Sequence, residues 1–423
     1  MTCPAISSSS SLSSHVSSAA HVSSSYHCQE RSLIQLSSFI SVPSQCFTCS
    51  SRRACRWTGM PCRASMELGQ ALSSTSLVSE SPFPSTSDVT WAQSALQGPR
   101  SEMEDSIVIR SDGLQGFCYA SVLDGHAGFS SVRFLREELF KECVTATQNG
   151  VLLQTSDLSS IQNLLTKAFL QADKRLLSWL EETGECLESG STATAMLLGS
   201  DCLIVAHVGD SRVVIARGGK ADVLCGDHRP YGKSKTALEE IKRIRHAGGW
   251  ISNGRVCGIL SVSRAFGDIK LKTLRQEMLE EGVKTGLWTS KFASRVDLNG
   301  DWVTAAPDVN RTVLEDADFI ILASDGLWDY IQSSEAVRFV RDQLHQHGDV
   351  QRACEALANL ALDKNGQDNV SVVIADFGKV QYDPNAPLED SNVSADAGQL
   401  VLVLGLVGLG IWLSQFASHA GLF

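Results

Sequence analysis

Acidic side chains stand at the ends of apolar runs in five segments of this 423-residue chain. The segments are RSEMEDSIVIR, FCYASVLDGHAG, AHVGDSR, DFIILASDGLWD and GQDNVSVVIADF, and their acids are Glu104, Asp105, Asp124, Asp210, Asp325, Asp329 and Asp368. A single acid at a strand end is ordinary, because Asp and Gly are turn formers. Five such segments together indicate that the strand ends meet, where carboxylates would raise one another's pKa unless cations neutralised them.

This cluster predicts a site for hard divalent cations. Oxygen-only ligand sets select Mg²⁺ or Mn²⁺, and Gly125 beside Asp124 would let a backbone carbonyl approach a metal closely. Two such ions about 4 Å apart can lower the pKa of a bridging water and orient it for in-line attack on phosphorus. No HExxH or Cys/His zinc spacing competes with this interpretation. The acids therefore predict metal-assisted hydrolysis of a phosphate ester.

Two further residues could serve that reaction. Arg100 lies four residues before Glu104, and a guanidinium binds phosphate through two parallel hydrogen bonds. His126 lies two residues after Asp124, and its ordinary pKa of about 6.5 suits proton donation to a leaving oxygen. Taken alone, Arg100 would be read as a surface arginine and His126 as a turn residue. Beside the acids, Arg100 is predicted to bind the phosphate and His126 to act as the general acid.

The segments that carry these residues predict an α+β fold. Short apolar runs at 106–110, 116–124, 192–199, 202–209, 212–219, 319–325 and 369–377 predict strands, whereas 3.6-residue periodicity predicts helices at 131–144, 158–182, 236–248 and 334–346. A Ser-Ser-Glu cap is expected to open the last helix. The short turns at 199–201 and 209–211 predict that three successive strands pair antiparallel. We expect two stacked antiparallel sheets, a β-sandwich with helices on the outside.

The ordered motifs resemble those of the metal-dependent, type 2C family of serine/threonine protein phosphatases. They are RSEMED, VLDGHAG, SGSTA, VGDSR, DHRP, HAGGWI, VCGILSVSRAFGD, AAPDV, ASDGLWD and GQDNVSVV, and they span the expected domain at 87–378. The resemblance implies Mg²⁺ or Mn²⁺ dependence and an α-β-β-α sandwich. Asp124 would bridge two ions, with Gly125 adding its carbonyl. Asp325 and Asp368 would complete one site, and Glu104 would hold the other ion directly or through water.

The resemblance also implies roles for the remaining candidates. Asp105 would orient a metal-bound water, Arg100 would bind the phosphate, and His126 would be the general acid. The acids of a weaker third metal site would be Asp210, Asp325 and Asp329. Residues that the pattern assigns to structure are Ser191, Thr192 and Asp268. Because none of the metal-binding positions is substituted, loss of activity is not indicated.

The chain departs from the family pattern in an insert at about 269–303. It carries six Lys or Arg residues between 270 and 295 on an otherwise acidic protein. We interpret the insert as a substrate-recognition element near the active site; the alternative is a solvated surface excursion. Cys257 also stands where many relatives have Asn, and we draw no conclusion from it.

The two ends of the chain read differently from the body. Residues 1–66 are rich in Ser, contain five Arg and have only one acid, which favours a cleaved plastid transit peptide over a disordered regulatory tail. Residues 67–86 would be a linker. The formal net charge is −11 for the whole chain and −15 without residues 1–66, which argues against a nucleic-acid partner.

At the other end, residues 397–418 contain no charged side chain and follow a polar, acidic linker at 379–396. A spanning helix needs about 20 residues, so we expect a transmembrane anchor there, followed by a short tail at 419–423. The alternative is a buried C-terminal helix, because Gly405, Gly408 and Gly410 lower helix propensity.

The combined features predict a monomeric protein phosphatase of the chloroplast thylakoid membrane, with its catalytic domain facing the stroma. This architecture resembles the thylakoid-associated members of the family, which implies phosphorylated light-harvesting complex II antenna proteins as substrates. Two rival functions remain. One is a catalytically silent adaptor that binds phosphoproteins with the same fold, and the other is a two-metal nuclease or small-molecule phosphohydrolase.

Overall fold

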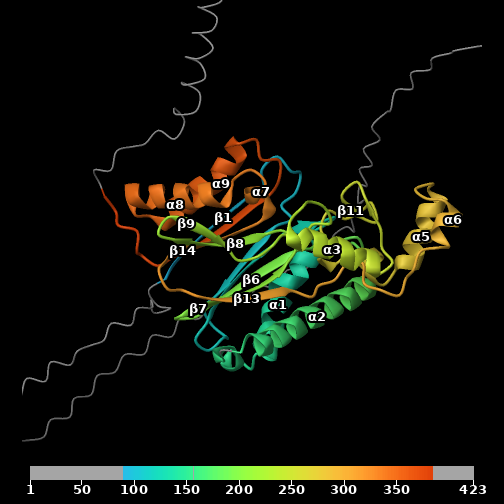
Figure 1. The fold of residues 1–423 in the computed structure, drawn as a ribbon, viewed down its shortest axis with the longest axis horizontal. Helices are drawn as coiled ribbons and strands as arrows, with labels where there is room; N and C mark the ends of the chain where they lie inside the picture. Colours follow the sequence, from blue (N-terminus) through green and yellow to red (C-terminus); the bar gives the residue numbers. More distant parts are fainter. Residues whose placement is uncertain (1–88, 156, 384–423) are drawn as a thin grey trace, which may run out of the picture. The chain divides into compact units, whose positions relative to one another are not determined.

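Two five-stranded antiparallel sheets form the centre of the protein (Figure 1). The computed structural model describes residues 89–155 and 157–383. One sheet has the order β1 (Thr90–Leu96), β15 (Val370–Asp376), β14 (Ala317–Ala323), β8 (Arg212–Arg217) and β9 (Lys220–Val223). The other has the order β13 (Asp308–Val313), β7 (Cys202–Val208), β6 (Ala193–Leu198), β3 (Cys118–Leu123) and β2 (Ser106–Arg110).

The sheets pack face to face, and helices cover their outer faces. Side chains of both sheets, among them Val122, Val205, Ile215 and Leu322, form one buried cluster between them. Helices α1 (Ser130–Ala146) and α2 (Leu158–Thr183) pack on one sheet, and α8 (Ser333–His347) and α9 (Val350–Asp363) pack on the other. The expected sandwich with helices outside is therefore confirmed.

The long helix α2 shows how the local sequence produces these layers. Asp157 caps its start by accepting hydrogen bonds from the backbone N–H groups of Ser159 and Ser160. Buried residues recur along one face at helical spacing, from Ile161 to Leu180. Gly184 ends the helix in the left-handed conformation, with φ at 63°. The apolar face therefore packs on the sheet while the opposite face meets solvent.

One predicted turn is not a hairpin. The turn at 199–201 joins β6 to β7, which pair antiparallel as predicted. The turn at 209–211 instead carries the chain from β7 in one sheet to β8 in the other, so the predicted pairing of these strands is wrong. Gly209 has φ at 114°, a conformation that lets the chain change direction between the sheets. This crossing places Asp210 at the edge where the two sheets meet.

The capping prediction for α8 is also wrong. The helix begins at Ser333, and Gln332 before it makes no side-chain capping hydrogen bond. The Ser333 hydroxyl instead accepts a hydrogen bond from Arg212 Nη1 at 3.2 Å. The Ser333 hydroxyl, which was expected to cap the helix, therefore makes a tertiary hydrogen bond with Arg212 instead.

The insert builds a small core of its own. It contains α4 (Ile269–Lys272), α5 (Arg275–Lys284) and α6 (Ser290–Ala293). Its apolar side chains pack with those of the preceding segment, which includes α3 (Lys235–His246) and the two-stranded β10 (Ile251–Ser252) and β11 (Arg255–Val256). The ring of Trp250 contacts those of Trp288, Phe292 and Trp302, with centroids 5.0 to 5.6 Å apart. The insert is therefore a packed subdomain.

A buried ion pair ties the start of the insert to α2. Lys272 Nζ lies 2.6 Å from Asp173 Oδ2, and both side chains are 9% exposed. Lys272 also donates to the Ala265 carbonyl at 2.8 Å, and Asp173 accepts from the Gly267 N–H at 2.9 Å. These bonds fix the segment that leads into Asp268.

The predicted ends of the chain fall outside this description. The presequence at 1–66, the anchor at 397–418 and the tail at 419–423 lie outside the described residues, as do the linker at 67–86 and most of that at 379–396. Within residues 89–155 and 157–383, no helix is both long and apolar enough to cross a membrane.

Candidate metal-dependent active site

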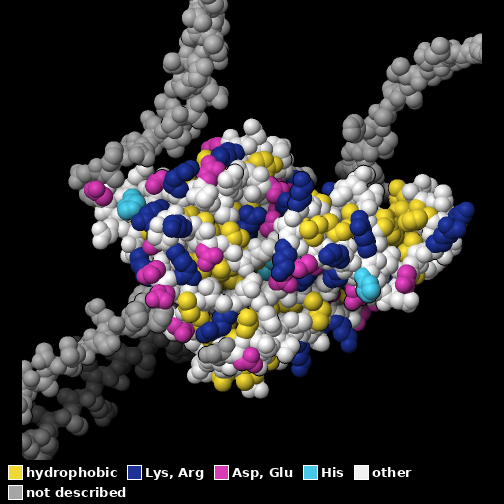
Figure 2. All heavy atoms as spheres, in the orientation of Figure 1, with side chains coloured by type: hydrophobic (Ala, Val, Ile, Leu, Met, Phe, Trp, Pro, Cys, Tyr) yellow, Lys and Arg dark blue, Asp and Glu magenta, His cyan; other side chains and the backbone are white. Residues whose placement is uncertain are grey.

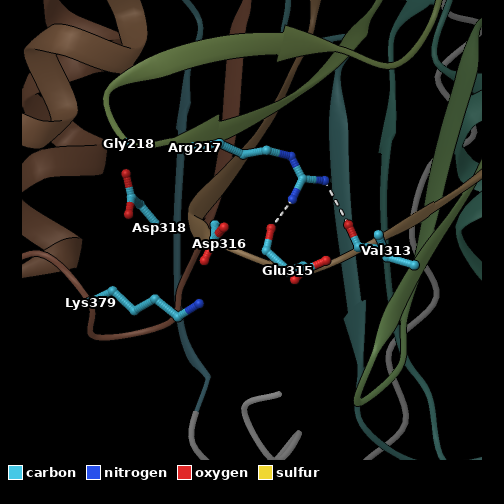
Figure 3. A pocket seen from close by; sticks show the side chains of 7 residues that line it. All are labelled: Arg217, Gly218, Val313, Glu315, Asp316, Asp318 and Lys379. Carbon is cyan, nitrogen blue, oxygen red and sulfur yellow. Dashed lines mark hydrogen bonds between the residues drawn. The ribbon is translucent and has the colours of Figure 1, made fainter. Parts of the chain in front are cut away.

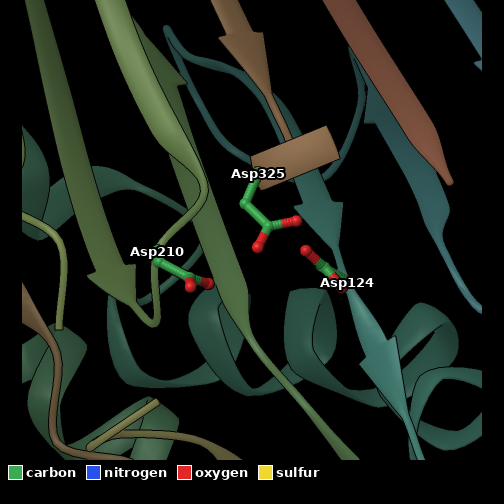
Figure 4. Close-up of side chains that lie close together, drawn as sticks. All are labelled: Asp124, Asp210 and Asp325. Atoms are coloured by element: carbon green, nitrogen blue, oxygen red, sulfur yellow. The ribbon is translucent and has the colours of Figure 1, made fainter. Parts of the chain in front are cut away.

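Three aspartates from different strand ends meet at one edge of the sandwich (Figure 4). Asp124 follows β3, Asp210 follows β7, and Asp325 begins α7 (Asp325–Trp328) just after β14. One carboxylate oxygen from each lies within 4.8 Å of the others. The predicted convergence of strand-end acids is thus present for these three, which come from both sheets.

The environment of these carboxylates opposes their negative charge. Burial raises the pKa of Asp124 and of Asp325 well above the usual range, and neighbouring carboxylates add to both shifts. Burial likewise raises the pKa of Asp210, although Arg229 acts in the opposite direction. Such a group is charged at neutral pH only beside positive charge, and an oxygen-only donor set suits a hard divalent cation. The residues present therefore fit the ions that the sequence predicts.

Arg229 supplies positive charge at this edge, and the sequence interpretation missed it. Its guanidinium contacts Asp210, Asp325 and Asp329 at 2.8, 3.2 and 2.9 Å. The DHRP motif contains this residue, but no local signal distinguishes it from a surface arginine. Only the fold brings Arg229 to carboxylates that lie 19, 96 and 100 residues away in the sequence.

Glu104 and Asp105 lie beside this cluster at the start of β2. The Glu104 carboxylate accepts a hydrogen bond from the Gly128 N–H at 2.5 Å. Asp105 is 6% exposed and accepts from the Ser324 hydroxyl at 2.9 Å. Burial raises the pKa of Asp105 to about 7, with Asp368 and Glu104 adding to the shift while the Ser324 bond opposes it. Both acids are thus next to the cluster, as predicted.

The phosphate-binding candidate Arg100 lies at the rim. Its Nη2 is 2.6 Å from Asp368 Oδ2, and its Nε donates to the Gln367 carbonyl at 3.0 Å. The Arg100 side chain is 51% exposed, so its outer face remains open to solvent. Asp368, just before β15, acts on the pKa of Asp105, Asp124 and Asp325, which places it in the same electrostatic cluster.

His126 pairs with Asp268, which the family pattern assigned only to structure. Its Nε2 lies 3.0 Å from both carboxylate oxygens of Asp268. Burial by itself lowers the pKa of His126, but Asp268, Glu104 and Asp210 more than offset burial and raise it. Asp268 therefore fixes one nitrogen of the predicted general acid and favours its protonated form.

Glycines make the close approach of these segments possible. A Cβ at Gly125 would lie 2.5 Å from the Glu104 carbonyl oxygen and 2.7 Å from Val132 Cγ2. A Cβ at Gly190 would lie 2.2 Å from His126 Nε2 and 2.5 Å from Asp268 Oδ2. Any larger residue at either position would separate the segments that carry the acids or the His126–Asp268 pair.

A surface hollow lies at the opposite end of the sandwich (Figure 3). It has a volume of about 630 Å³ and is lined by Arg217, Gly218, Val313, Glu315, Asp316, Asp318 and Lys379. Arg217 and Asp318 lie at the ends of β8 and β14 that are distant from Asp210 and Asp325. Five or six residues of extended strand separate the two regions by roughly 20 Å. The hollow therefore does not belong to the carboxylate site.

Comparison with known proteins decides the family. The sequence model of Protein phosphatase 2C matches residues 90–370, about two thirds of the chain. The chain belongs to this phosphatase family. Protein phosphatase 2C members are metal-dependent serine/threonine phosphatases, so the predicted enzyme class and metal dependence are confirmed.

Individual phosphatase 2C proteins agree with this assignment. Protein phosphatase 2C 57 of Arabidopsis thaliana is 52% identical over 332 residues, which cover 78% of this chain and 85% of that protein. Protein phosphatase 1A of Homo sapiens is 30% identical over 302 residues, covering 70% and 71% of the two chains. The crystal structure of serine-threonine phosphatase 2C from Toxoplasma gondii has a TM-score of 0.54 at 20% identity. It covers 70% of this chain and 98% of its own, and it supports the fold alone.

Proposed function

We propose that this phosphatase 2C protein is a membrane-tethered enzyme that uses Mg²⁺ or Mn²⁺ to dephosphorylate serine and threonine residues of proteins. The carrying observation is the close cluster of Asp124, Asp210 and Asp325, in which negative charge is stable only beside positive charge such as that of a divalent cation. The silent-adaptor alternative is less well supported, because every acid of the predicted metal set is present. A nuclease would need a basic groove, which the acidic net charge argues against.

The chain's own residues divide the work between binding and proton transfer. Arg100, open to solvent at the rim, would orient the substrate phosphate. His126 would donate a proton to the leaving serine or threonine oxygen, and Asp268 would keep its ring in one orientation. Asp105, held by the Ser324 hydroxyl at 2.9 Å, would orient the attacking water. Bound divalent ions would supply a water nucleophile of lowered pKa and neutralise the phosphate.

We propose the insert as the element that recognises the phosphoprotein. Three of its six basic side chains bond within the protein: Lys270 to Glu188 and Glu281, Lys272 to Asp173, and Arg275 to the Gly300 carbonyl. The other three, Lys284, Lys291 and Arg295, are exposed. Leu287 and Phe292 are also exposed, at 71% and 39%. Figure 2 shows hydrophobic side chains gathered over the β11 to α5 region, with Lys and Arg beside them.

The proposed substrates are light-harvesting complex II antenna proteins in the thylakoid membrane. Support comes from the transit-like composition of residues 1–66 and the uncharged run at 397–418, together with the phosphatase domain between them. Quantitative phosphoproteomics of isolated membranes with and without the enzyme tests this proposal. Antenna phosphorylation should rise in its absence, and unchanged antenna phosphorylation would exclude these substrates.

Activity measurements on the full-length chain test the catalytic proposal. The wild-type protein with Mn²⁺ should hydrolyse a phosphothreonine peptide, and EDTA should remove most of that activity. Asp124→Asn should abolish turnover while leaving the far-UV circular dichroism spectrum unchanged. Asp316→Asn, on the distant hollow, is the matched control and should behave as wild type. Full turnover in EDTA would refute the metal mechanism, and phosphopeptide binding without turnover would support the adaptor.

A further inference from the structure

One guanidinium is shared by three carboxylates of the site. Arg229 Nε donates to Asp210 Oδ2 at 2.8 Å, whereas Nη2 donates to Asp325 Oδ2 at 3.2 Å and to Asp329 Oδ1 at 2.9 Å. The Arg229 side chain is 17% exposed, and that of Asp210 is 6% exposed. Charge-assisted bonds in such a shielded place are strong.

These three carboxylates are the ones that the family resemblance assigns to a third, weaker metal site. Two of them, Asp210 and Asp325, also belong to the group of acids whose oxygens lie within 4.8 Å of one another. A carboxylate oxygen that accepts a short guanidinium hydrogen bond has less electron density to offer a cation. Arg229 and a divalent cation would therefore compete for the same carboxylate oxygens of Asp210, Asp325 and Asp329.

The backbone at Arg229 is fixed against the turn that carries Asp210. The His228 N–H donates to the Gly209 carbonyl at 2.7 Å, and the Gly209 N–H donates to His228 Nδ1 at 3.1 Å. His228 is fully buried, and its Nε2 lies 3.2 Å from Asp308 Oδ2. Because these bonds hold the main chain just before Arg229, we expect Arg229 to leave the carboxylates by rotation of its side chain.

We propose that Arg229 is a built-in counter-ion that competes with a divalent cation for Asp210, Asp325 and Asp329. This inference rests on the proposed metal-dependent function and adds a control of cation occupancy at the same site. When the cation is absent, Arg229 neutralises the acids and stabilises the fold. When it binds, the guanidinium must swing away, and the lost hydrogen bonds weaken cation binding.

Titration with Mn²⁺ tests the competition directly. The full-length protein, freed of metal, is titrated by isothermal calorimetry and by electron paramagnetic resonance of free Mn²⁺. Arg229→Gln should tighten the weakest Mn²⁺ site by about tenfold or more, the equivalent of one charge-assisted hydrogen bond. Arg212→Gln is the matched control, because Arg212 is 20% exposed and pairs with Asp227. The control should leave the affinity of that site unchanged.

Thermal unfolding gives a second readout that does not depend on turnover. Without metal, Arg229→Gln should unfold at a lower temperature than wild type, since three acids lose their counter-ion. Saturating Mn²⁺ should raise its unfolding temperature by more than it raises that of wild type. If Arg229→Gln does not fold, Arg229→Lys keeps the charge but not the three-way hydrogen bonding. The weakest Mn²⁺ site of Arg229→Lys should then bind Mn²⁺ more tightly than the same site of the wild-type protein.

The outcomes separate this inference from the proposed function. If wild type binds Mn²⁺ but neither substitution tightens the weakest site, competition by Arg229 is refuted and the metal centre stands. A weaker site in Arg229→Gln or Arg229→Lys would also overturn the inference, because Arg229 would then organise the ligands. If no protein binds Mn²⁺, the inference and the proposed metal-dependent function fail together.

Discussion

Asp268→Asn should weaken the general acid without disturbing the metal ligands. Asp268 is 7% exposed, and both of its oxygens lie 3.0 Å from His126 Nε2. Asparagine keeps the size and one acceptor oxygen but removes the charge. A hydrogen bond to a charged partner exceeds a neutral one by roughly 1.5 kcal/mol. At 1.36 kcal/mol per factor of ten, proton donation by His126 should slow about tenfold.

The assay is hydrolysis of aryl phosphates whose leaving groups differ in pKa. The substitution should lower kcat about tenfold for phenyl phosphate, whose phenolate leaving group needs a proton. It should lower kcat little for p-nitrophenyl phosphate, because p-nitrophenolate departs as a stable anion without a proton. A general loss of structure would slow both equally. The matched background is His126→Ala, in which Asp268→Asn should have little further effect, because the two residues act as a unit. Equal loss across leaving groups, or a full tenfold loss on the His126→Ala background, would refute the reasoning.

Two further predictions concern stability and location. Glu240 is 2% exposed, and ion pairs with Arg264 and Arg243 lower its pKa from the usual 4.5 to about 2 against the effect of burial. The stabilisation of the folded state by the ionised Glu240 carboxylate is therefore complete above about pH 4.5 and is lost as the pH falls towards 2. Urea unfolding of Glu240→Gln should show a loss of about 3 kcal/mol at pH 7 that shrinks below pH 4.5; an equal loss at every pH would contradict the assignment. Deletion of residues 397–423 should leave phosphopeptide hydrolysis intact and move the protein from the membrane to the soluble fraction. Unfolding of the truncated protein would instead make this segment part of the core.

Local patterns predicted most of the central strands, the edge strand β2 and the long helices, but not the edge strands β1, β9 and β13. Among the described residues, strands β1 and β13 lie at the sheet edges and pair with another strand on one side only. Their sequences, TWAQSAL and DVNRTV, are mixed in polarity because these strands are only partly buried. Helix α9 was also missed, since much of its buried face is alanine, a weak hydrophobic signal. Periodicity therefore finds elements that are strongly apolar on at least one face.

The crossing at 209–211 shows the limit of turn chemistry. A Gly-Asp-Ser turn is compatible with a hairpin and with a change of sheet, and the local sequence does not distinguish them. Packing decides, because β7 pairs with β6 and β13 while β8 pairs with β14 and β9. The consequence is functional, because the crossing places Asp210, which follows β7 of one sheet, beside Asp325, which follows β14 of the other sheet.

By itself, the sequence determined which residues could do chemistry here. Turn-forming acids at the ends of apolar strands indicated a metal site, and ten short motifs in a fixed order indicated the phosphatase family, because both signals lie in the local sequence or its order. Only the tertiary structure decided what those residues contact. Asp268 lies 142 residues from His126, and Arg229 lies 96 residues from Asp325. No periodicity or turn rule relates residues so far apart, because their contacts arise from the packing of the two sheets and the insert.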